Sequence, residues 1–138
     1  MCDMLPRLFF VHFRQTSFVA EDNGNRVGFL TGFISQTFPE EAYIHFAGVH
    51  PEFRQRGVGR ALYERLFSVV ISLGCQLVRG VTSPVNRGSV AFHLRMGFMV
   101  QPADASVEGL RIARDYDGRG EDRVLLVKRL EARLPWQR

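Results

Sequence analysis

The chain has 138 residues, 46% of them hydrophobic, and a formal charge of +4 at pH 7, which together indicate one globular domain over residues 1–138. No apolar run reaches the about 18 residues that a membrane helix needs, so we expect no membrane partner. The 18 basic residues are mixed with 14 acidic ones, and without a basic tail or an aromatic–basic motif they favour an anionic small molecule over nucleic acid as partner.

The first elements that the sequence predicts form a hairpin. Residues 16–20 and 26–36 read as strands, and Asn23 and Gly24 between them favour the positive φ of a tight turn. Residues 8–11, before the hairpin, fit either the end of a helix or an additional strand. After a break, residues 42–49 form a third predicted strand.

Helices and strands alternate in the rest of the chain. Residues 57–73 carry apolar side chains at helical spacing, and Gly74 is expected to end that helix. Further along, the predicted elements are a strand over 75–81, a helix over 86–95, and strands over 98–100 and 123–130, with loop and turn over 101–122. Asn86 is a suitable cap for the second helix. The order predicts a mixed α/β sheet with helices on its faces.

The two cysteines and the first residues of the chain indicate in which cellular compartment the protein is expected. Cys2 and Cys75 are too few for a disulfide framework, and no metal-type spacing is present, so we expect free thiols and no metal. Cys75 lies in an apolar stretch and is expected to be a small core residue. The first residues lack the basic and apolar regions of a signal peptide, which makes a cytoplasmic location the expectation.

The segment that joins the strand over 42–49 to the helix over 57–73, together with the first residues of that helix, is rich in glycine and arginine. Backbone N–H groups at a helix start have no intrahelical partner and carry partial positive charge. Glycine lets the backbone approach a phosphate closely. The N–H groups of residues 56–60 are therefore the predicted pyrophosphate cradle, with Arg54 or Arg56 adding a side-chain contact. A plain tight turn and a solvated basic loop are the alternatives.

These residues carry a family resemblance. The run Arg54-Gln55-Arg56-Gly57-Val58-Gly59 resembles the acetyl-CoA signature of GNAT-superfamily N-acetyltransferases: Arg or Gln, two variable residues, Gly, one variable residue, then Gly or Ala. Val49-His50-Pro51 resembles the family's strand-to-loop junction. A second block resembles the family's later helix and its Gly-Phe ending, and comprises Asn86 through Ser89, Phe92, His93, Gly97 and Phe98. Two motifs in this order are a stronger signal than one glycine pattern.

The resemblance covers roughly residues 17–138 and implies a mixed, mostly antiparallel central sheet with flanking helices. Residues 1–15 are too few for the family's usual first strand and helix, so this part is expected to be short or atypical. The implied activity is transfer of an acetyl group from acetyl-CoA to a primary amine of a small molecule or peptide. A non-catalytic CoA-binding or sensing module is the alternative function, and a homodimer is one expected form of partner.

The resemblance also implies cofactor contacts. Their residues are Val49, Arg54, Gln55, Arg56, Gly57, Val58, Gly59, Arg60, Asn86, Ser89 and Phe92. The Val49 amide is assigned to the thioester oxygen, because the family places a bulge near this end of the strand and Gly48 fits a bulge. Helix capping explains Asn86 equally well.

Acid–base roles fall to two histidines. His45 is the best candidate for the base that takes the amine proton, because its unperturbed pKa is about 6.5 and strand alternation places it on the face of Val49 unless the bulge intervenes. A packed histidine is the alternative, and Tyr43 or Glu41 are weaker bases acting through water. His93 stands where many relatives have a tyrosine, and in its charged form it could protonate the leaving thiolate; a helix-surface contact is the alternative. His12 and His50 are expected to be structural or surface residues.

Overall fold

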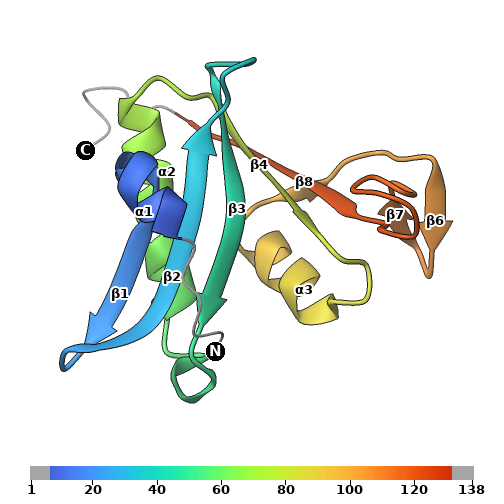
Figure 1. The fold of residues 1–138 in the computed structure, drawn as a ribbon. Coiled ribbons are helices and arrows are strands. Elements are labelled where there is room, and N and C mark those ends of the chain that lie inside the picture. Colours follow the sequence, from blue (N-terminus) through green and yellow to red (C-terminus); the bar gives the residue numbers. More distant parts are fainter. Residues whose placement is uncertain (1–6, 132–138) are drawn as a thin grey trace. The chain divides into compact units, whose positions relative to one another are not determined.

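The structure is a computed structural model that describes residues 7–131, and the chain divides into two compact units (Figure 1). One unit holds Met1–Gln76 and Leu130–Arg138, and the other holds Leu77–Arg129. The described elements are α1 (Arg7–His12), η1 (Arg14–Thr16), β1 (Phe18–Asp22), β2 (Asn25–Ile34), β3 (Glu41–Val49), η2 (Pro51–Phe53), α2 (Val58–Ser72), β4 (Leu77–Thr82), α3 (Arg87–Arg95), β5 (Met99–Val100), β6 (Ala105–Val107), β7 (Leu110–Ile112) and β8 (Val124–Arg129).

The first unit contains an antiparallel sheet in the order β1-β2-β3, which confirms the predicted hairpin. Asn23 and Gly24 have φ values of 51° and 81°, as a two-residue turn with two positive φ values requires. Strand β1 begins two residues later than predicted because Thr16 belongs to η1, where its hydroxyl donates to the Gly32 carbonyl at 2.6 Å.

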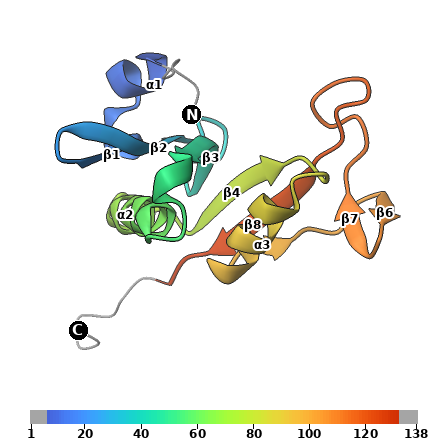
Figure 2. The same cartoon turned by 90° about the horizontal axis from the view of Figure 1, so that it is seen from below.

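Helices α1 and α2 cover opposite faces of the β1-β2-β3 sheet (Figure 2). The predicted helix over 57–73 is confirmed as α2, and its apolar side is buried at Leu62, Leu66 and Val70, four residues apart as an amphipathic helix requires. The helix approaches β2 closely, since a Cβ added at Gly28 would lie 2.9 Å from a Val58 methyl group. On the other face, Phe9 of α1 is buried.

Strand β3 has a bulge at His45. The pairing of Thr31 with Phe46 changes to Gly32 with Ile44, so His45 has no partner on β2. The bulge predicted at Gly48 is wrong, because Gly48 stays in register opposite Phe29. A Cβ at Gly48 would lie 3.0 Å from the Phe29 ring, so this glycine makes room for an aromatic side chain rather than for a bulge.

The second unit contains an antiparallel sheet in the order β4-β8-β5 together with α3. The predicted second helix is confirmed, and Asn86 caps it by accepting from the Ser89 N–H at 3.1 Å. Strand β4 starts at Leu77, two residues after the predicted start. Cys75 therefore precedes the strand, but it is buried as expected, and its N–H donates to the Val70 carbonyl at 2.9 Å.

A second small sheet occupies part of the segment that was expected to be loop and turn. Strands β6 and β7 pair around a turn in which Glu108 and Gly109 have φ values of 51° and 82°. An ion pair joins Glu108 to Arg87 at the start of α3. The predicted class, a mixed α/β fold with mostly antiparallel strands and flanking helices, is confirmed. Among residues 7–131, no helix combines the length and the apolar character that crossing a membrane requires.

Candidate active site

The connection from β3 to α2 is shaped by local hydrogen bonds. His50 caps η2, where its Nδ1 accepts from the Glu52 N–H at 3.2 Å and its carbonyl accepts from the Phe53 N–H at 2.8 Å. Gln55 and Gly57 then adopt positive φ values of 65° and 82°. These two left-handed residues turn the chain so that the backbone N–H groups following Gly57 open α2.

Among residues 7–131, the N–H groups in the first turn of α2 have no hydrogen-bond partner. Gly57 is the N-cap and supplies no side-chain acceptor, and the turn contains no acidic side chain. The first bond of the helix runs from the Ala61 N–H to the Gly57 carbonyl at 2.9 Å, so the N–H groups of residues 58–60 precede the intrahelical ladder. This arrangement fits an anion such as a diphosphate, as the sequence predicted.

The three arginines around this turn are exposed but differently held. The Arg56 guanidinium lies over the Phe53 ring at 5.0 Å from its centroid. Arg60 pairs with Glu64 at 3.3 Å, with both side chains more than half exposed. Within residues 7–131, Arg54 has neither an ion pair nor a ring contact. Arg54 is therefore the side chain of the three most available for a bound anion.

His45 lies on the face of the sheet that α1 covers. Its ring stacks on Phe9 at 4.8 Å with an angle of 11° between the planes. Val49 pairs with Gly28, whose Cβ position faces α2. Directly paired residues share a face of the sheet, so the Val49 side chain also faces α2, on the side opposite to His45. The bulge intervenes in strand alternation, so His45 and Val49 lie on opposite faces rather than on the shared face that an unbroken strand would give.

Aromatic rings surround His45 on the α1 face. Phe9 also contacts Phe13 and Phe33 at 5.2 and 6.4 Å, and Phe33 stacks on Tyr43 at 5.5 Å. His45 remains exposed beside them. We call the set Phe9, Phe13, Phe33, Tyr43 and His45 the aromatic wall. It provides an apolar surface with one titratable group that solvent or a ligand can reach.

In the second unit, a hydrogen-bond chain joins β4 to α3. Thr82 Oγ1 donates to Ser89 Oγ at 2.9 Å, and His93 Nδ1 donates to the Ser89 carbonyl at 2.7 Å. His93 is only 8% exposed and lies edge-on to the half-buried Phe92 and to Phe98. Burial lowers the pKa of His93 below its ordinary value, and the Ser89 carbonyl only partly opposes this shift.

The lowered pKa bears directly on the acid role predicted for His93. A neutral imidazole whose Nδ1–H is given to a carbonyl has no proton on Nε2. Only the charged form could donate a proton from Nε2, and burial disfavours that form. The structure therefore favours the packing role of His93 over the acid role, and the acid role stays a prediction.

The buried His93 predicts a pH-dependent stability. Between the lowered pKa of the folded chain and about 6.5, the unfolded chain binds the additional proton, so the free energy of unfolding falls as pH falls through this window and is level above it. Urea unfolding at about pH 7.5 and about pH 5 should show this loss. His93→Gln should reduce the difference, whereas His12→Gln, at the exposed end of α1, should leave it as in the wild type.

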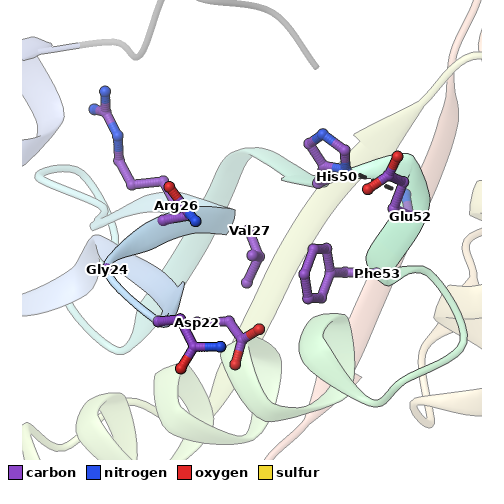
Figure 3. A pocket seen from close by; sticks show the side chains of 9 residues that line it. Asp22, Gly24, Arg26, Val27, His50, Glu52 and Phe53 are labelled. Carbon is purple, nitrogen blue, oxygen red and sulfur yellow. Dashed lines mark hydrogen bonds between the residues drawn. The ribbon is translucent and has the colours of Figure 1, made fainter.

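Two adjoining cavities lie beside the β1–β2 turn and the start of α2, with volumes of about 570 and 550 Å³. Asp22, Val27 and Phe53 line both of them. Figure 3 shows Val27 and Phe53 facing each other, with the Asp22 carboxylate below them and the Arg26 guanidinium extending away. These cavities could not be predicted from the sequence, because they depend on how β1 packs against α2. Among residues 7–131, no cluster of three metal-ligating side chains occurs.

Comparison with known proteins identifies a family. The family described as Acetyltransferase (GNAT) family matches residues 3–98. An L-2,4-diaminobutyric acid acetyltransferase of Nocardia farcinica is 34% identical over 79 residues, which are 57% of this chain and 41% of that protein. The chain thus spans about two fifths of the length of this relative.

Solved structures share the fold. Ard1 of Thermoplasma volcanium has a TM-score of 0.74 at 20% identity, over 89% of this chain and 76% of that one. The putative acetyltransferase yncA of Salmonella typhimurium, solved with acetyl-CoA, has a TM-score of 0.71 at 22% identity, over 93% and 74% of the two chains. With the family match covering more than half of its residues, this chain belongs to the acetyltransferase (GNAT) family.

Proposed function

We propose that the protein is an acetyl-CoA-dependent N-acetyltransferase that moves an acetyl group to a primary amine of a small molecule or peptide in the cytoplasm. The observation that carries the proposal is the start of α2. Its N–H groups are uncapped, no acid lies in its first turn, and left-handed Gln55 and Gly57 precede it. Such a turn suits a diphosphate.

Cofactor binding is assigned to two groups of residues. The backbone N–H groups of residues 56–60 hold the diphosphate, and Gln55 and the side chains of Arg54 and Arg56 add contacts, each charge-assisted bond being worth about 1.5–3 kcal/mol. The family resemblance also predicts cofactor contacts at Asn86, Ser89 and Phe92. Bound acetyl-CoA supplies an activated thioester, and the protein supplies the groups around it.

The chemistry assigned to this chain has two parts. His45 takes the proton of the amine, since an ammonium has no lone pair with which to attack; its exposed ring beside the aromatic wall supports this role. A backbone N–H near the end of β3, with Val49 as the predicted donor, meets the thioester oxygen as negative charge grows there.

A second candidate function is a module that binds CoA without catalysis. The specific observation in its favour is the burial of His93, which lowers its pKa and so disfavours the charged form that an acid role needs. A module of this kind needs the α2 turn but neither an acid nor a base.

Calorimetric titration followed by an amine panel tests both candidates. We expect CoA and acetyl-CoA to bind and to stabilise the fold by mass action, and a thiol-release assay with diamino acids and peptide N-termini to show turnover. Binding without turnover on any amine supports the module. Absence of binding to either compound would refute the assignment of the α2 turn.

A further inference from the structure

We propose that the outer edge of β1 is a self-association surface, on which a second copy of this chain pairs its own β1 in antiparallel orientation. Strand β1 stands at the end of the strand order, and among residues 7–131 its only strand partner is β2. The outer side of an edge strand presents N–H and C=O groups that a further strand can bind.

A groove accompanies this edge. The cavity of about 550 Å³ lies between β1 and α2. Its lining includes one stripe of α2 at the spacing i, i+3, i+4 and i+7, formed by Val58, Ala61, Leu62 and Arg65. From β1 come Phe18 and Ala20, which face α2 because they pair with Leu30 and Gly28. An added strand would therefore meet an apolar floor as well as a backbone edge.

Charges of opposite sign lie at the two ends of β1. Glu21 and Asp22 end the strand, while the Arg65 guanidinium lies over the Phe18 ring near its start, 5.9 Å from the centroid. Within the described residues, neither acid has an ion-pair partner, and Arg65 has none. One surface thus carries both halves of a charge pair that is not formed among the described residues.

Antiparallel pairing about Ala20 closes that pair. With Ala20 opposite the partner's Ala20, Phe18 lies opposite the partner's Asp22 on the α2 face, next to Arg65. Two-fold symmetry produces the contact twice. Pairing centred on Glu21 would instead place like charges opposite each other, which is unfavourable. The self-complementary order of apolar, small and acidic residues therefore favours a second copy over an unrelated strand.

Sedimentation equilibrium of the full chain and of charge variants tests the proposal. The wild type should form dimers, and Asp22→Arg or Arg65→Asp should each weaken the dimer about tenfold, because a modest surface pair is lost twice per dimer. The double variant should recover most of the loss by exchanging the two charges. Glu131→Arg and Arg119→Asp make the same charge changes at exposed sites outside the surface and should leave association unchanged.

A disulfide tests the register. In a chain with Cys2→Ser, Ala20→Cys should form a covalent dimer on oxidation, because directly opposed residues have Cα atoms about 4.5–5.5 Å apart, within the reach of a disulfide. Thr37→Cys, exposed beyond the end of β2, should not. A wild type that stays monomeric at the highest soluble concentration overturns the proposal, and so does a dimer that both single charge variants leave intact.

Discussion

Replacement of His45 by phenylalanine is expected to lower kcat for acetyl transfer by about 10²–10⁴-fold, the usual contribution of a positioned general base. Phenylalanine keeps a planar ring on Phe9, with which His45 stacks at 4.8 Å, while removing both ring nitrogens. The free energy of unfolding should therefore change by less than about 0.5 kcal/mol, as at other exposed sites. Steady-state kinetics with a saturating amine, together with urea unfolding, measure the two quantities.

The matched control is His12→Phe, the same substitution at the exposed end of α1, and it should keep wild-type kcat. The two variants must be compared at several pH values, because a higher pH supplies more unprotonated amine and partly replaces the base. If His45→Phe keeps full activity at neutral pH, the base is another group, and Tyr43 on the same aromatic wall is then the next to replace.

Local signals predicted much of the fold. The turn at Asn23 and Gly24 depends on two residues that tolerate positive φ, and the structure has both values. Helix α3 depends on a cap that reaches only three residues along the chain, from Asn86 to Ser89. The start of α2 likewise depends on residues close together in the sequence, chiefly on Gly57 with its left-handed backbone. The candidate diphosphate turn could therefore be found from the sequence.

Features that depend on distant partners could not be found in this way. The position of the bulge is set by the register between β2 and β3, where Thr31 pairs with Phe46 but Gly32 pairs with Ile44. Gly48 suggested a bulge because its neighbour across the strands, Phe29, was unknown. A sequence shows that a position lacks a side chain but not which group occupies the space.

The burial of His93 was hidden for the same reason. Its place on α3 was predicted correctly, but its exposure of 8% depends on packing against Phe98, outside the helix. The sequence suggested that a charged His93 could act as an acid. Burial lowers the pKa of His93 and so disfavours its charged form. The β6–β7 hairpin was missed because a segment dense in charge reads as a solvated loop.

Replacement of Gly57 by alanine is expected to raise the KM for acetyl-CoA by about 10–100-fold, the loss of one charge-assisted hydrogen bond or slightly more. A Cβ at this position meets no atom within 4 Å, so the cost comes from φ, which is +82°. Alanine disfavours that value by about 1 kcal/mol, and relief of the strain would rotate the N–H groups that open α2. Binding of CoA by calorimetry should weaken by the same factor as the KM rises.

Gly74→Ala separates cofactor binding from backbone strain. Gly74 follows the other end of α2 with φ of +91° and, like Gly57, has no atom within 4 Å of an added Cβ. Both variants should lower the free energy of unfolding by about the same 1 kcal/mol, but only Gly57→Ala should change the KM for acetyl-CoA. Equal KM values in the two variants would mean that the N–H groups at the start of α2 do not hold the diphosphate. Because the variants share a helix, a substitution and a backbone conformation, a difference between them can arise only from what each end of α2 binds.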